Sequence, residues 1–186
     1  MDHSMMSVDL TPAINVLAES LKTLGWQMGT AESCTGGGIA YYLTEVPGSS
    51  AWFAGSVVSY SNAVKQDVLG VTSHDLMDYG AVSEQVVAQM AQGALRVLNI
   101  DCAVSVSGIA GPGGATPRKP LGMVCFAWSW RDAHGTSHAR TTTKQFTGDR
   151  HSIRVQTVEY AILGMQRLCD AFGSGDWYFE SFERDD

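Results

Sequence analysis

A serine, a lysine and three glycine-rich turns are the features of this 186-residue chain that point to chemistry. Ser33 stands in the first turn, residues 30–38, directly after a short segment with strand character. Near a helix start, backbone N–H groups can hold an anion or a developing oxyanion beside such a side chain. The alternative is that Ser33 only caps the helix. Cys34 is a second candidate nucleophile, ranked lower because free cysteines usually pack in the core.

Lys65 follows a buried-looking strand and is one of only four lysines in the chain. A lysine accepts a proton from a serine only while it is neutral, which requires burial or a nearby cation to lower its pKa. Tyr60, at the end of the same strand, is a candidate for orienting a substrate or passing a proton. The alternatives are a solvated helix lysine and a tyrosine whose hydroxyl lies in water.

The third turn, residues 107–114, and the start of the last predicted helix are candidates for anion binding. Ser107 and the glycines that follow offer a hydroxyl and backbone amides, and Arg150 can bind a phosphate or carboxylate with two nitrogens. The alternatives are a turn that only reverses the chain and an arginine in a surface ion pair. For Glu32 three roles are open: an acid, a residue that orients a partner, or a structural acceptor for loop amides. The first turn matches neither a P-loop, nor a dinucleotide-binding fingerprint, nor a nucleophile elbow.

Composition narrows the class of protein. With 45% apolar and 17% charged residues the chain suits a single globular domain, and its net charge of -7 without a basic run argues against nucleic-acid binding. No apolar stretch is long enough for a membrane span, and residues 1–10 lack the order of a signal peptide. Scattered cysteines and histidines predict reduced thiols in a cytoplasmic protein, with no metal and no cofactor.

The order of apolar runs and turn signals predicts alternating strands and helices followed by a hairpin. This pattern is typical of a single-domain α/β protein, a three-layer α/β/α sandwich with a mixed β-sheet. Ligand sites in such folds lie at strand ends, where the first and third glycine turns fall. We expect a flexible N-terminus at 1–10, the domain at 11–172 and an aromatic, acidic tail at 173–186.

Local signals set the expected bounds of the elements. Thr11 is predicted to cap the first helix with Pro12 at its first position, and Ser61 and Ser83 to cap two later helices. Residues 72–82 are expected to be irregular, with one helical turn. The expected helices are 12–24, 36–44, 62–69, 84–98 and a long one from 150, and the expected strands are 26–30, 52–60, 102–107, 123–130 and 139–146.

Taken together, the motifs of residues 11–172 resemble those of the C-terminal domain of the competence/damage-inducible protein CinA. Each motif alone is weak, but the whole set in this order is highly specific. The motifs are Ala31-Glu32-Ser33-Cys34-Thr35-Gly36-Gly37, Val46-Pro47-Gly48-Ser49-Ser50, Tyr60-Ser61-Asn62 with Lys65, Gly80-Ala81-Val82-Ser83-Glu84, Ser107-Gly108-Ile109-Ala110-Gly111-Pro112-Gly113-Gly114, Lys119-Pro120-Leu121-Gly122 and Gly148-Asp149-Arg150.

Members of that family include deamidases of nicotinamide mononucleotide (NMN), which hydrolyse its carboxamide to give nicotinate mononucleotide and ammonia in pyridine-nucleotide salvage. The resemblance implies the same amidohydrolase activity here, with Ser33 as nucleophile, Lys65 as its base and Tyr60 in support. Family members often carry threonine at the position of Ser107, and serine keeps the hydroxyl. The substrate-binding residues that the resemblance suggests are Thr35, Gly36, Gly37, Ser50, Ser107, Gly108, Gly111 and Arg150.

In that chemistry, loop amides near Gly36 and Gly37 are expected to hold the oxyanion, and the third turn with Arg150 to hold the phosphate. Apolar residues of the tail suggest a homo-oligomer. Two alternatives remain open: a catalytically inactive nucleotide-binding module, and a module that binds a protein partner through its aromatic tail.

Overall fold

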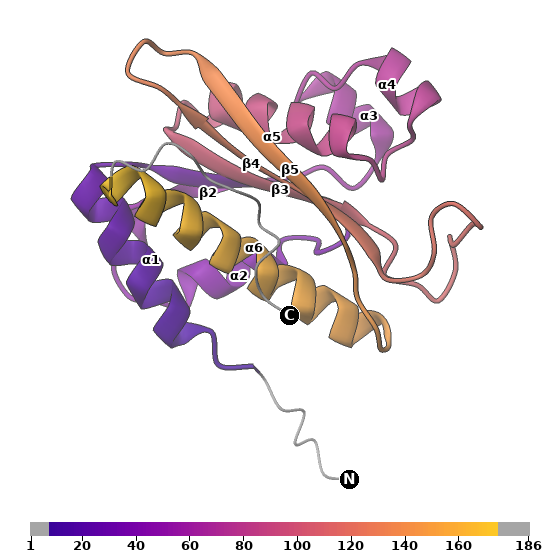
Figure 1. The fold of residues 1–186 in the computed structure, drawn as a ribbon, viewed down its shortest axis with the longest axis horizontal. Coiled ribbons are helices and arrows are strands. Elements are labelled where there is room, and N and C mark those ends of the chain that lie inside the picture. The colour runs from indigo at the N-terminus through magenta and orange to yellow at the C-terminus, as the bar shows by residue number, and fades with distance from the viewer. Residues whose placement is uncertain (1–7, 175–186) are drawn as a thin grey trace, which may run out of the picture.

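The structure, a computed structural model, describes residues 8–174 and confirms the predicted α/β fold (Figure 1). A five-stranded sheet runs in the order β2-β1-β3-β4-β5. The first three strands in the chain are parallel to one another, whereas the β3–β4 and β4–β5 pairs are antiparallel, so the sheet is mixed. The strands are β1 (Met28–Glu32), β2 (Phe53–Val58), β3 (Cys102–Gly108), β4 (Met123–Arg131) and β5 (Ser137–Gln145).

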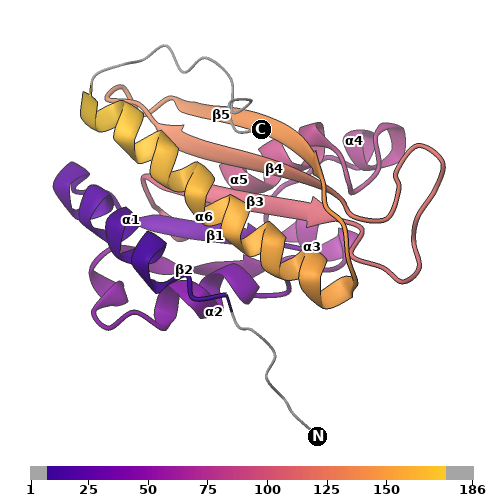
Figure 2. The same cartoon turned by 60° about the horizontal axis from the view of Figure 1, so that its bottom comes forward.

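Helices cover both faces of the sheet and give the three layers (Figure 2). On one face α1 (Thr11–Leu24), α2 (Gly38–Thr44) and α6 (Arg150–Ser174) pack on large side chains such as Phe126 and Trp128. On the other face, α5 (Glu84–Leu98) packs on small residues of the central strands. The remaining elements are α3 (Asn62–Asp67), α4 (Ser73–Asp78) and a short 3-10 helix, η1 (Ser49–Ala51).

Close packing fixes the segment that follows α3 against α5. A Cβ atom on Gly93 of α5 would lie 2.2 Å from the backbone oxygen of Leu69, so only glycine permits this approach. Leu69 and Val71 are buried here beside Val87 and Met90 of α5. The sheet and α5 thereby hold both ends of α3, the helix that carries Lys65.

Two of the three predicted capping residues define helix starts. The hydroxyl of Ser83 accepts a hydrogen bond from the Val86 N–H, and α5 has the predicted bounds. Ser61 caps α3 in the same way. The prediction for Thr11 is wrong: α1 begins at Thr11 itself, whose N–H donates to the Asp9 carboxylate at 3.0 Å. As a cap, the Thr11 hydroxyl would accept from an N–H two or three residues later, whereas Asp9 accepts from the Thr11 N–H itself.

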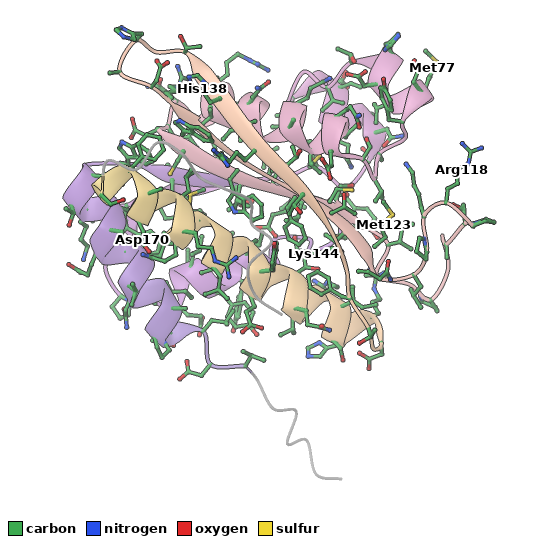
Figure 3. The ribbon with its side chains drawn as sticks, viewed as in Figure 1. Met77, Arg118, Met123, His138, Lys144 and Asp170 are labelled. Atoms are coloured by element: carbon green, nitrogen blue, oxygen red, sulfur yellow. The ribbon has the colours of Figure 1, made fainter. Side chains whose placement is uncertain are left out.

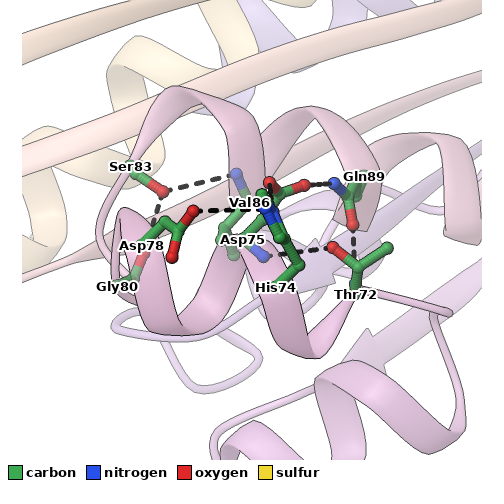
Figure 4. Close-up of polar contacts among 8 residues, drawn as sticks. All are labelled: Thr72, His74, Asp75, Asp78, Gly80, Ser83, Val86 and Gln89. Atoms are coloured by element: carbon green, nitrogen blue, oxygen red, sulfur yellow. Dashed lines mark hydrogen bonds and ion pairs between the residues drawn. The ribbon is translucent and has the colours of Figure 1, made fainter.

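Residues 72–82 contain one short helix, α4, where a single helical turn was predicted. Thr72 caps it by accepting from the Asp75 N–H at 3.2 Å. Gln89 of α5 accepts from the Thr72 N–H and donates to the Asp75 carboxylate, so α4 is tied to α5 (Figure 4). These contacts place the chain at 79–83 beside the carboxyl edge of the parallel strands.

The predicted flexible N-terminus and aromatic tail fall largely outside the described residues, which leave out 1–7 and 175–186. Leu10, just before α1, is buried in the core. Helix α6 continues to Ser174. Within residues 8–174, none of the helices combines the length and the apolar character needed to cross a lipid bilayer.

Candidate active site

A cavity of about 220 Å³ opens at the carboxyl ends of β1 and β3. It brings together six of the residues predicted from the sequence: Ser33, Lys65, Tyr60, Ser107, Gly108 and Arg150. The other lining residues are Cys34, Asn62, Ala81, Val82 and Ala110. Parallel strands share one carboxyl edge, so loops that leave β1, β2 and β3 meet there although they lie far apart in sequence.

Ser33 and Lys65 form the polar pair of this cavity. The distance between Ser33 Oγ and Lys65 Nζ is 3.1 Å. The Ser33 N–H donates to the Val106 carbonyl at 3.1 Å, which fixes the turn against β3. Lys65 Nζ also donates to the backbone oxygens of Ser59 at 2.7 Å and Tyr60 at 3.5 Å. Three oxygens therefore surround the amine.

Burial favours the neutral form of the Lys65 amine. Lys65 is 1% exposed, and no carboxylate among residues 8–174 forms an ion pair with it. Desolvation lowers the pKa of Lys65 below its ordinary value, and the neighbouring Cys34 opposes this shift. A neutral amine has two N–H groups for the two carbonyls and one lone pair that can accept from the Ser33 hydroxyl, so the site has room for the uncharged form.

Glu32 organises the turn that carries Ser33 and takes the structural role weighed for it. Its carboxylate is fully buried. One oxygen accepts from the Thr35 hydroxyl at 2.7 Å, and the two oxygens together accept from three amides at the start of α2. The amides belong to Gly37, Ile39 and Ala40. A buried carboxylate that gathers this many donors holds the turn in one conformation.

Among the loop amides expected to hold an oxyanion, those of Gly36 and Gly37 themselves are already engaged. The Gly36 N–H donates to the Ser33 carbonyl at 3.1 Å, and the Gly37 N–H to Glu32 at 2.9 Å. Both glycines have positive φ, 62° and 93°, so they serve the shape of the turn. Together with Thr35 they line a different cavity, of about 290 Å³.

Cys34 lines the cavity, and its thiol stays protonated. The side chain is buried, and burial raises the pKa of the thiol to about 12, so almost no thiolate forms near neutral pH. This supports the preference for Ser33 as nucleophile. Within residues 8–174 the Cys34 N–H donates no hydrogen bond to the backbone or to another side chain.

Arg150 lies at the first position of α6 and links that helix to the third glycine turn. Its Nη1 atom donates to the Gly111 carbonyl at 2.7 Å. Gly111 itself does not line the cavity. Arg118, further along the loop between β3 and β4, does not line it either, and its side chain points outward (Figure 3). Ser107, at the end of β3, is buried beside the cavity.

Ser50 is separated from the cavity. It lies exposed in η1, which precedes β2 and therefore belongs to the amino edge of the parallel strands. The cavity is at the carboxyl edge, and Ser50 does not line it. The motif that contains Ser50 turns the chain into β2, so the structure gives this residue no contact with the predicted nucleophile.

Sequence reasoning missed three polar or backbone contributors. Asn62 lines the cavity from the start of α3, and Ala81 and Val82 line it from the turn before α5. All three occur in the motifs quoted above, and their place in those motifs is the one sequence signal that could have identified them. A fourth residue, Arg154, donates from α6 to the Thr35 carbonyl at 2.6 Å and had no such signal.

Comparison with known proteins places the chain among close relatives. Residues 11–169 match the model of a family described as "CinA C-terminal domain". A nicotinamide-nucleotide amidohydrolase PncC from Enterobacter agglomerans is 47% identical over 78% of this chain and 87% of that protein. The enzyme of the same name from Escherichia coli K12 is 43% identical over 85% and 93%. The crystal structure of competence/damage inducible protein CihA from Agrobacterium tumefaciens superposes with a TM-score of 0.79, at 38% identity, and covers 90% of this chain and 99% of that one.

Proposed function

Because this chain belongs to the CinA C-terminal domain family, we propose that it is an amidohydrolase that converts NMN to nicotinate mononucleotide and ammonia. Relatives that it matches over most of their length are named nicotinamide-nucleotide amidohydrolases. The observation that carries the proposal is the 3.1 Å contact between Ser33 Oγ and the buried amine of Lys65. A serine and an uncharged lysine form a nucleophile and its base.

In the first half-reaction, Ser33 Oγ attacks the carboxamide carbon while its proton passes to Lys65 Nζ. The carbonyl π electrons move to oxygen, and the Cys34 N–H, which donates to no other residue among 8–174, is the donor that we assign to this oxyanion. Collapse of the tetrahedral intermediate breaks the C–N bond. Lys65 returns the proton to the leaving nitrogen, ammonia departs and an ester to Ser33 remains.

In the second half-reaction, water attacks the ester and gives its proton to Lys65. The C–O bond to Ser33 breaks, and Lys65 returns the proton to Ser33 Oγ. The new carboxylic acid gives its remaining proton to solvent, and nicotinate mononucleotide leaves with a carboxylate in place of the amide. The pyridinium charge of bound NMN helps to keep Lys65 neutral in the first step, since like charges disfavour protonation. Tyr60, whose side chain is 63% exposed at the cavity, remains the candidate for contact with the substrate or for proton transfer.

Ammonia release tests the activity directly. The purified chain is incubated separately with NMN, with nicotinamide riboside and with nicotinamide, and ammonia is measured with a coupled enzyme. We expect release from NMN at rates well above those from the two compounds without phosphate. Saturable binding of NMN with no ammonia after long incubation would instead identify a catalytically inactive nucleotide-binding module.

Arg150 and the third glycine turn are our candidates for the phosphate of NMN. The guanidinium lines the cavity and forms hydrogen bonds to anions with two nitrogens when they are available. Arg150→Met is expected to raise KM for NMN about tenfold to a hundredfold, because hydrogen bonds to charged groups contribute about 1.5–3 kcal/mol. Steady-state kinetics on NMN and on the riboside check this.

Arg118→Met is the matched control, because Arg118 carries the same charge on the neighbouring loop but points to solvent. Its KM for NMN should stay at the wild-type value. An equal loss on NMN and on the riboside in Arg150→Met would contradict a phosphate role. That result would point to the contact with Gly111 instead.

Two further expectations remain predictions from the sequence. The first is a homo-oligomer, inferred from apolar residues of the tail, which falls outside the described residues apart from 173 and 174. The second is a cytoplasmic location.

A further inference from the structure

Arg154 reaches from α6 to the turn that carries Ser33. Its Nη2 atom donates to the Thr35 carbonyl at 2.6 Å, across 119 positions of sequence. The guanidinium also lies against Gly36, where an added Cβ would be 3.8 Å from Nη2. A hydrogen bond from a charged donor is shorter and about twice as strong as one between neutral groups.

Thr35 is therefore held from opposite sides. Its hydroxyl donates to the buried Glu32 carboxylate at 2.7 Å, and its carbonyl accepts from Arg154 and from the Gly38 N–H at 3.2 Å. Thr35 is completely buried and stands two residues after Ser33. The Glu32 carboxylate thus holds the turn from its inner side, and the Arg154 guanidinium of α6 holds it from its outer side.

Folding stability alone does not explain Arg154. Within residues 8–174 the guanidinium has no ion-pair partner, and its Nε is buried without a hydrogen-bond partner. A buried donor without an acceptor costs about 1–3 kcal/mol. The one hydrogen bond that Arg154 forms in this part of the chain is the bond to the turn.

We propose that Arg154 is a positioning residue for the nucleophile: it fixes the Thr35 carbonyl and thereby the orientation of Ser33 Oγ and the Cys34 N–H. This inference rests on the proposed amidohydrolase function. A displacement of about 1 Å at a reacting group can cost about a hundredfold in rate. Arg154 touches neither Ser33 nor Lys65 through any hydrogen bond, so its effect is transmitted through the turn.

The kinetic test compares Arg154→Ala with Arg154→Lys. We expect kcat for NMN to fall about tenfold to a hundredfold in the alanine variant, with KM changed less than about twofold, because the turn is misplaced while Arg150 remains. The lysine variant keeps a charge and one donor and should have an intermediate kcat. His151→Ala is the matched control, since His151 lines the same 290 Å³ cavity and has no hydrogen bond to the turn.

Chemical rescue separates positioning from a general requirement for folding. Arg154 borders a cavity, so its removal leaves a space that millimolar guanidinium or ethylguanidinium can enter. Either cation should restore part of the lost kcat of Arg154→Ala, whereas tetramethylammonium, which has no N–H donor, should not. The cations should leave the wild type unchanged. Circular dichroism and thermal unfolding establish whether the variants are folded. If Arg154→Ala is not folded, the kcat of Arg154→Lys is compared with that of the wild type instead.

The outcomes are distinct. Inactivity of the wild type on NMN would refute the proposed function itself. With an active wild type, three results would overturn the inference: an unchanged kcat in folded Arg154 variants, a change in KM alone, or a loss of kcat that neither guanidinium cation restores. The inference is supported if guanidinium restores part of the kcat lost in Arg154→Ala and if Arg154→Lys loses less kcat than Arg154→Ala.

Discussion

Ser33→Ala is expected to reduce kcat for ammonia release from NMN by roughly four to six orders of magnitude, the scale seen when a catalytic serine is removed. The substitution deletes the atom that attacks the carboxamide. It leaves Arg150 and the third glycine turn in place, so the variant should still bind NMN. Ser33 is 9% exposed, and within residues 8–174 its side chain forms one hydrogen bond, with Lys65, so little else depends on the hydroxyl.

Two measurements check this prediction. Ammonia release gives the activity, and calorimetric titration gives the affinity for NMN. Ser137→Ala, at the exposed start of β5, is the control and should behave as wild type. Rapid acid quenching of the wild type with NMN, followed by peptide mass spectrometry, should locate a nicotinoyl-nucleotide ester on Ser33. Activity above about a hundredth of the wild type in Ser33→Ala would show that another group is the nucleophile.

Lys65→Met is expected to abolish most activity without unfolding the protein. General bases contribute about a hundredfold to ten-thousandfold in rate, and methionine keeps the length and apolar stem of lysine without the lone pair. The substitution leaves the Ser59 carbonyl without the donor that lies 2.7 Å from it, and a buried group left without its hydrogen-bond partner costs about 1–3 kcal/mol. The free energy of unfolding at pH 7, from urea titration, should therefore fall by no more than about 3 kcal/mol.

The pH dependence of activity has a defined sign. The pKa of folded Lys65 is below the ordinary 10.5, because burial disfavours the ammonium form. As pH rises through the folded-state pKa, the fraction with a neutral amine increases, so kcat/KM for NMN should increase with it. A profile with no ascending limb on the acidic side would contradict the role of Lys65 as base.

The pH dependence of stability follows from the same shift. Between the folded-state pKa and 10.5 the unfolded chain binds a proton that the folded protein does not, so the contribution of Lys65 to stability rises with pH across this window. Lys65→Met should lack this rise. Lys22→Met is the matched control, since Lys22 is a surface lysine paired with Glu19 at 2.9 Å, and it should keep the wild-type profile.

The sequence alone determined the fold class and the identity of the central pair. Periodic apolar runs predicted alternating strands and helices, and hydroxyl residues predicted the starts of α3 and α5, because caps and periodicity act within a few residues. The ordered set of motifs singled out Ser33, Lys65 and Arg150, and the cavity contains all three. Thr11 is not a cap because α1 already includes it, and its own N–H donates to the Asp9 carboxylate.

Only the tertiary structure decided which groups meet. Ser33 and Lys65 are 32 positions apart, and the shared carboxyl edge of β1, β2 and β3 brings them to 3.1 Å. The same topology sends Ser50 to the opposite edge. The buried Glu32 carboxylate accepts the hydrogen bond of the Gly37 N–H, so that amide is not available to a ligand. Helix α6 packs across the sheet and brings Arg154 to the Thr35 carbonyl. These outcomes depend on strand order and on contacts between distant segments, which no local spacing encodes.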